Sequence, residues 1–100
     1  MKLLALLFLL TLTGLAHADY TGTVSNVHTF KDGGIAINLD GKWPHSKMTL
    51  YIAPKNVAQF TALPAKGDIV TGIGKTIDYE GYPEIILEEP SQLKITPGKM

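Results

Sequence analysis

Four aromatic side chains are the residues of this sequence best suited to hold a flat ligand. They are Trp43 in a loop segment, Tyr51 on the polar face of an alternating segment, and Tyr79 and Tyr82 on either side of a Glu-Gly dipeptide. Aromatic rings stack on nucleobases for about 1 to 3 kcal/mol per base, whatever the base. The alternative is that Trp43 covers one end of a core and that the tyrosines are ordinary half-buried strand residues.

Lysines that accompany these aromatics could supply local positive charge. The lysines considered for this role are Lys31, Lys42, Lys47 and Lys75. The whole chain has a formal net charge of +0 and contains no arginine, the residue that grips phosphate with a bidentate fork. Strong electrostatic binding of nucleic acid is therefore disfavoured, and stacking would have to supply most of the affinity.

Residues for catalysis or metal binding do not form a recognisable set. His28 and His45 have no second histidine or cysteine at metal-ligand spacing, and the neighbours His45 and Ser46 need not face one another as a hydrolytic pair would. Alternation puts Glu84 and Glu88 on one strand face, as is common on solvated strands. We expect no catalytic residues, no metal and no cofactor, and thus a protein that is not an enzyme.

The N-terminus has the pattern of an export signal. Lys2 precedes an apolar run that extends to Leu15 and ends in Ala16-His17-Ala18. This run is shorter than the roughly twenty residues that a membrane-spanning helix needs, although a retained anchor helix is the alternative. We predict a signal peptide at 1–18, cleavage between Ala18 and Asp19, no membrane anchor, and a periplasmic or secreted location.

The remaining residues, 19–100, read as one small domain of strands. Alternating or β-branched segments bounded by Gly, Asp and Pro predict strands, and Pro54 predicts the start of a helix of at most two turns. The expected strands are 20–30 with a bend or bulge at Gly22, 35–39, 48–52, 69–79 and 83–88.

The order of these elements, β-β-β-α-β-β, is that of the OB-fold, a five-stranded Greek-key barrel. A two-sheet sandwich is the alternative; five strands with glycines in the first and fourth favour closure. The expected core is apolar and comes from the inward positions of each strand: Val24, Ile35, Ile37, Leu39, Leu50, Ile52, Val70, Ile85 and Leu87.

Two motifs carry a resemblance to a known family. The segments 67–72 (Gly-Asp-Ile-Val-Thr-Gly) and 79–87 (Tyr-Glu-Gly-Tyr-Pro-Glu-Ile-Ile-Leu), followed by Pro-Ser-Gln-Leu at 90–93, resemble the small bacterial OB-fold domains often labelled nucleic-acid-binding or DNA-binding. The resemblance implies binding through the barrel face and loops. Such domains often have a lysine or arginine where this chain has Tyr82, which favours stacking over phosphate contact at that position.

Two binding functions follow as expectations. The first is an exported, non-enzymatic OB-fold module that binds single-stranded nucleic acid or oligonucleotides through the aromatic residues. The second is an adaptor that binds a protein, a peptide or a cell-envelope glycan on the same face, which the near-neutral charge and the exposed aromatics also suit.

Overall fold

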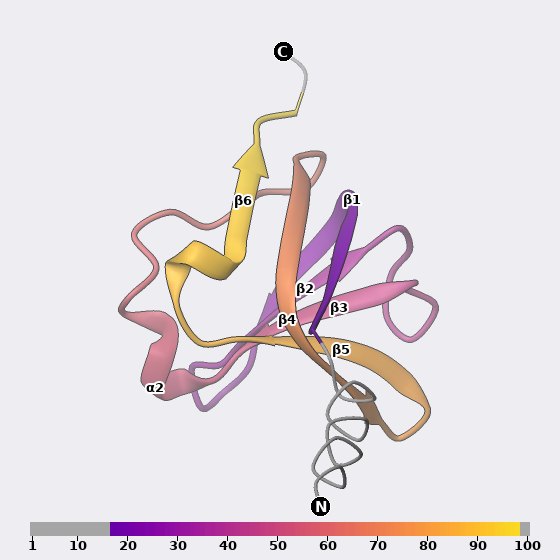
Figure 1. Ribbon diagram of the computed structural model, residues 1–100, viewed down its shortest axis with the longest axis horizontal. Helices are drawn as coiled ribbons and strands as arrows, with labels where there is room; N and C mark the ends of the chain where they lie inside the picture. The colour runs from indigo at the N-terminus through magenta and orange to yellow at the C-terminus, as the bar shows by residue number, and fades with distance from the viewer. Residues whose placement is uncertain (1–16, 99–100) are drawn as a thin grey trace, which may run out of the picture.

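The computed structural model describes residues 17–98, which form six strands, one short α-helix and one 3-10 helix (Figure 1). The predicted signal peptide lies outside these residues except for His17 and Ala18, which begin the first strand. In the part of the chain that the structure describes, neither helical segment is long and apolar enough to cross a membrane. The elements are β1 (His17–Thr29), β2 (Ile35–Leu39), β3 (Met48–Ile52), α2 (Pro54–Val57), β4 (Ile69–Tyr79), β5 (Tyr82–Leu87), η1 (Pro90–Gln92) and β6 (Leu93–Thr96).

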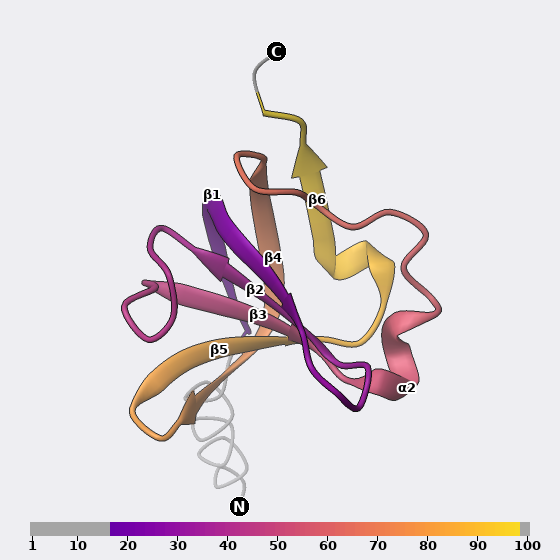
Figure 2. The same ribbon diagram turned by 180° about the vertical axis from the view of Figure 1, so that it is seen from behind.

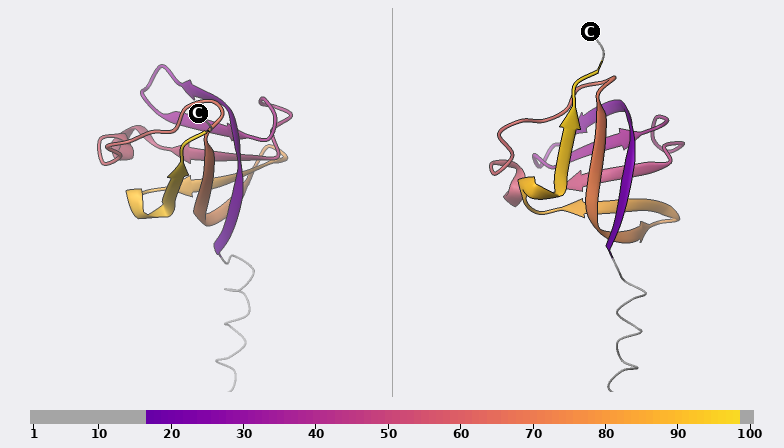
Figure 3. Two further views of the ribbon diagram at one scale, coloured as in Figure 1. Left: turned by 90° about the horizontal axis from the view of Figure 1, so that it is seen from above. Right: turned by 45° about the horizontal axis from the view of Figure 1, so that its top comes forward.

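Five strands form a sheet that closes on itself. The strand order is β1-β2-β3-β5-β4-β6, and an additional β1–β4 pairing joins the two ends of the five-strand set (Figure 3). All pairings are antiparallel except β3 with β5. The prediction of a mainly β domain with one short helix between the third and fourth strands is confirmed.

Strands β1 and β4 are long, and each pairs with one neighbour along its first part and with another along its second part. In β1, residues 17–23 pair with β4 and residues 24–29 with β2, and the register shifts between Val24 and Asn26. A bend or bulge was expected at Gly22, and the register shift lies just beyond it; a Cβ on Gly22 would lie 2.5 Å from Oδ2 of Asp40. In β4, a Cβ on Gly72 would lie 2.5 Å from Cδ2 of Leu50, so this glycine lets β4 approach the core closely.

The interior of the closed sheet is a single apolar core. Alternate side chains of each strand point inward, which is the reason that period-two sequences supply it. The predicted nine core residues are all buried, and Met48 and Phe60 complete the cluster. Helix α2 buries none of its own residues, but the turn after it carries Phe60 into the core.

A sixth strand that the sequence did not predict, β6, extends the sheet beyond β4. It pairs residues 93–96 with residues 69–72. The chain returns to β4 through η1, which lies beside α2 at one side of the sheet (Figure 2). Gln92 holds this return: its Oε1 accepts from the amides of Glu88 and Glu89, and its Nε2 donates to the carbonyls of Ile73 and Ile86.

A tyrosine–aspartate hydrogen bond joins β1 to the end of β2. The Tyr20 hydroxyl donates to Oδ2 of Asp40 at 2.6 Å, and the Thr23 amide donates to the other carboxylate oxygen at 3.0 Å. These bonds hold the pKa of Asp40 below its usual value, and the Asp40 bond raises the pKa of Tyr20 to about 12. Both shifts favour the pair with Asp40 ionised and Tyr20 protonated.

We expect Tyr20→Phe to lower the free energy of unfolding at pH 7 by about 1 kcal/mol, a modest value because the pair is only partly buried. Asp40 has a depressed pKa, so its contribution is present above the unfolded value of about 4 and is lost as the pH falls through its folded pKa. Tyr20 has a raised pKa, so its contribution is lost as the pH rises from about 10 towards 12. Urea melts of parent and variant across this range should therefore differ most between these limits; a constant difference would contradict the assignment.

A concave aromatic face as the candidate site

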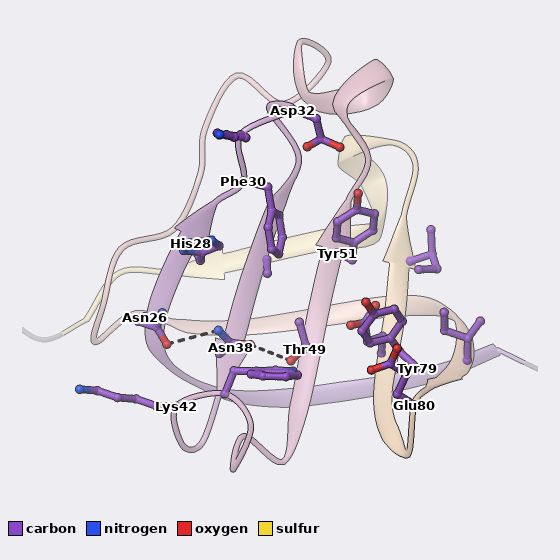
Figure 4. Close-up of a pocket in the computed structure, with 16 residues that line it drawn as sticks. Asn26, His28, Phe30, Asp32, Asn38, Lys42, Thr49, Tyr51, Tyr79 and Glu80 are labelled. Atoms are coloured by element: carbon purple, nitrogen blue, oxygen red, sulfur yellow. Dashed lines mark hydrogen bonds between the residues drawn. The ribbon is translucent and has the colours of Figure 1, made fainter.

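The outer face of the closed sheet is hollowed on the side formed by β1, β2, β3, β5 and the end of β4 (Figure 4). The hollow has a volume of about 1080 Å³ and is lined by sixteen residues. Most of them are the outward members of the same alternation that builds the core. They are Asn26, His28, Phe30, Lys31, Asp32, Ala36, Asn38, Lys42, Trp43, Thr49, Tyr51, Ile77, Tyr79, Glu80, Glu84 and Ile86.

A row of polar side chains crosses the floor of this face. Strand register aligns Asn26 with Asn38, Asn38 with Thr49, and Thr49 with Glu84. Thr49 donates its hydroxyl hydrogen to Oδ1 of Asn38 at 2.7 Å, and Asn38 donates through Nδ2 to Oδ1 of Asn26 at 3.3 Å. Because the Thr49 hydrogen is used in this way, Ser46 is the donor in the 3.2 Å hydroxyl contact between Ser46 and Thr49.

The two ends of this polar row differ in whether they offer hydrogen-bond donors or acceptors to a ligand. Asn38 and Thr49 are each only 2% exposed, and among the described residues no buried side-chain polar atom lacks a partner. The oxygen of Asn26 is occupied by Asn38, which leaves the Asn26 amide hydrogens directed away from the network at the β1 end. The opposite end of the row is the carboxylate of Glu84, which can only accept when ionised. The floor thus runs from donors at β1 to acceptors at β5.

Aromatic rings lie on both sides of the polar row. On one side His28 meets Phe30 edge-on at 4.6 Å between ring centroids, and Phe30 meets Tyr51 at 6.2 Å. On the other side Trp43 packs against Tyr82 at 5.1 Å. Phe30, Trp43 and Tyr79 are 41%, 46% and 48% exposed, so much of each ring faces solvent.

The β4–β5 turn positions two of the tyrosines. Glu80 and Gly81 both have positive φ, 50° and 92°, and the Gly81 amide donates to Oδ1 of Asp78 at 2.6 Å. This tight connection pairs Tyr79 directly with Tyr82, so both side chains lie on the same face of the hairpin. The two-residue hairpin turn predicted at Glu80-Gly81 is confirmed.

Charged residues of both signs line the hollow, and Asp32 lies directly after Lys31 on the β1–β2 side. Lys31 and Lys42 come from the loops after β1 and β2, whereas Glu84 and Glu80 come from β5 and the β4–β5 turn. Figure 4 shows His28 and Lys42 on the β1–β2 side and Tyr79 and Glu80 across from them. Burial raises the pKa of Glu84, and burial together with the charge of Asp32 and Glu84 raises the pKa of Tyr51.

Eight residues were predicted from the sequence to bind a ligand, and the structure brings five of them together around this hollow. The remaining three do not line it. Tyr82 packs against Trp43 instead, Lys47 is exposed beside the Asp40 carboxylate, and Lys75 is exposed on the part of β4 that pairs with β1. The five lining residues are Trp43, Tyr51, Tyr79, Lys31 and Lys42.

Several lining residues were not singled out from the sequence. Asn26 and His28 alternate along β1 and Phe30 directly follows it, so the period of two could have assigned them to the outward face together with Tyr51. Glu84 was interpreted as part of a solvated strand surface, but it is half-buried on the floor of the hollow, whereas Glu88 lies beyond β5 and is exposed. No local pattern reveals that β3 and β5 are neighbours, which is what puts Glu84 next to Thr49.

The residues considered for metal or hydrolytic chemistry were His28, His45 and Ser46. Within residues 17–98, no group of three or more His, Asp or Glu side chains gathers where it could hold a metal ion. Ser46 is engaged with Thr49, and the neighbouring His45 is exposed in the β2–β3 loop. No protein-family model and no curated protein matches the chain. The concave aromatic face is therefore the feature from which a function can be inferred.

Proposed function

We propose that this chain is an exported, non-enzymatic OB-fold module that binds single-stranded nucleic acid on its concave aromatic face. Closure of five strands through β1–β4, with a helix between β3 and β4, supports the OB-fold assignment. In that fold the face of strands 2 and 3 and the adjoining loops form the ligand site. The hollow described above occupies this face.

The observation that carries the proposal is the exposure of aromatic rings on a concave surface. Phe30, Trp43 and Tyr79 each expose more than 40% of their surface there, although apolar rings of this size normally avoid water. Stacking bases on these rings would bury them. Lys31 and Lys42 on one border are suited to contact a few phosphates, which agrees with a binder that depends little on charge.

The test uses Trp43, the single tryptophan of the chain, as the probe. Adding single-stranded oligodeoxycytidine of about ten nucleotides should change its fluorescence, since a site of this kind spans about 4 to 16 nucleotides. If Lys31 and Lys42 each contact one phosphate, log affinity should fall with log salt with a slope of about −1.4. No change at low salt and high protein concentration would overturn the proposal.

A second candidate function is the binding of a cell-envelope glycan, because OB-folds also bind oligosaccharides. The carboxylates of Asp32, Glu80 and Glu84 line the hollow together with the aromatic rings, and carboxylates accept hydrogen bonds from sugar hydroxyls. A neutral oligosaccharide would change Trp43 fluorescence with no dependence on salt. That result, with no response to the oligonucleotide, would favour this candidate.

A further inference from the structure

Glu84 occupies a special position on the concave face. Register places it between Thr49 of β3 and Ile77 of β4, at the acceptor end of the polar row. The aromatic residues Tyr51 and Tyr79 stand on neighbouring positions of the same face, and Glu84 is close enough to Tyr51 to raise the pKa of its hydroxyl. A base that stacks on either ring would present its edge near this carboxylate.

The Glu84 carboxylate lacks a partner in the described part of the chain. Burial alone accounts for its raised pKa, and neither a hydrogen bond nor a nearby positive charge among residues 17–98 offsets that burial. The amides and hydroxyls of the row satisfy one another, ending at Asn26 on the far border. A half-buried carboxylate of this kind gains most from a ligand that brings a hydrogen-bond donor.

The exocyclic amino groups of nucleobases are such donors. Cytosine carries an amino group where thymine and uracil carry a carbonyl oxygen, and a carboxylate accepts from the former and repels the latter. The lysines and the Asn26 amide lie on the opposite border of the hollow, where they face the phosphates of a strand whose bases point towards β5. The lysine side of the hollow thus suits the phosphate of a nucleotide, and the Glu84 side suits the amino group of its base.

We propose that Glu84 makes the site selective for bases with an exocyclic amino group, so that cytosine-rich single strands bind more tightly than thymine- or uracil-rich ones. This inference rests on the proposed function. Cytosine and thymine form the sharpest comparison, because both are pyrimidines of similar stacking area and differ mainly at the group that Glu84 would contact.

The test compares oligodeoxycytidine and oligodeoxythymidine of equal length on three proteins. The parent should bind the cytosine strand about tenfold more tightly, within the range that one good side-chain–base contact gives. Glu84→Gln should bring the two affinities close together, mainly by strengthening thymine binding, because an amide can also donate to the thymine carbonyl. Glu88→Gln, an exposed position outside the hollow, removes the same charge and should leave the preference unchanged.

The outcomes separate this inference from the proposed function. Equal affinities of the parent for both strands, or a cytosine preference that survives in Glu84→Gln, would overturn the selectivity while leaving the binding function intact. Absence of binding by either strand would overturn both. Urea melts of each variant establish that it is folded, and the cytosine-to-thymine ratio is insensitive to a loss of active protein because both strands are measured on the same sample.

Discussion

Replacing Leu50 by alanine should lower the free energy of unfolding by about 2 to 5 kcal/mol, a large part of the stability of a domain of this size. Leu50 is fully buried and lies at the centre of β3, paired with Ile37 of β2 and Ile85 of β5. Its Cδ atoms reach across the interior to the backbone of β4 at Gly72. Truncation would leave a cavity where four strands meet.

The contact between Leu50 and Gly72 allows a sharper test by a double-mutant cycle. Gly72→Ala alone should destabilise, because the new Cβ would lie 2.5 Å from Cδ2 of Leu50 and the core must shift to accept it. In the Leu50→Ala background the same methyl group enters the cavity, so Gly72→Ala should cost much less there or should stabilise. The coupling, measured by urea melts, should be about 1 kcal/mol or more.

Ile73→Ala is the matched control for this cycle. Ile73 is the neighbour of Gly72 on β4 but points outward and is 41% exposed, so its truncation should change stability by only about 0.5 kcal/mol. Melts of Leu50→Ala that match the parent would show that the β3 register is wrong, and additive effects of the Leu50 and Gly72 changes would show that the two residues do not touch.

Strands and core could be predicted from the sequence because both depend on local alternation. Ile35, Ile37 and Leu39 repeat every second residue, as do Leu50 and Ile52, and a strand with this pattern can bury only one set of side chains. The glycines of the fourth strand were expected to favour closure, and at Gly72 the side chain of Leu50 fills the space that a Cβ would take.

Features that depend on long-range pairing could not be predicted in this way. β6 has four residues, too few for a clear period, and Gln92 ties it to the sheet through carbonyls of Ile73 and Ile86, which lie far from each other in sequence. The register of β1 shifts between Val24 and Asn26, and Gly22 lies where a Cβ would meet the Asp40 carboxylate. The structure at these residues depends on contacts with residues distant in sequence, which local patterns do not reveal.

In the candidate site too, some features follow from local sequence patterns and others depend on long-range strand pairing. Aromatic residues stand out by type, and the outward position of Tyr51 follows from alternation, so part of the concave face was accessible to sequence reasoning. The polar row from Asn26 to Glu84 was not, since it requires the register of four strands and the parallel pairing of β3 with β5. Lys47 and Lys75 were predicted as sources of local positive charge, yet neither of them lines the hollow.

Removal of the stacking rings should weaken binding of a single strand. Trp43→Ala, Tyr51→Ala and Tyr79→Ala should each lose about 1 to 3 kcal/mol of binding free energy if a base stacks on each ring. Anisotropy of a labelled oligodeoxycytidine measures this without relying on Trp43 as the probe. Leu63→Ala serves as the control, because Leu63 is a 41% exposed apolar side chain that does not line the hollow.

Tyr82 provides the most discriminating variant of this series. It does not line the hollow but packs against Trp43 at 5.1 Å, so Tyr82→Ala should weaken binding by releasing the indole from its position. The effect should therefore disappear when Trp43 is already absent: the double variant should bind as Trp43→Ala alone does. Additive losses of binding free energy in the double variant would mean that Tyr82 contacts the nucleic acid itself. Wild-type affinity in all the aromatic variants, with a steep salt dependence, would mean that binding is electrostatic and that the rings take no part in it.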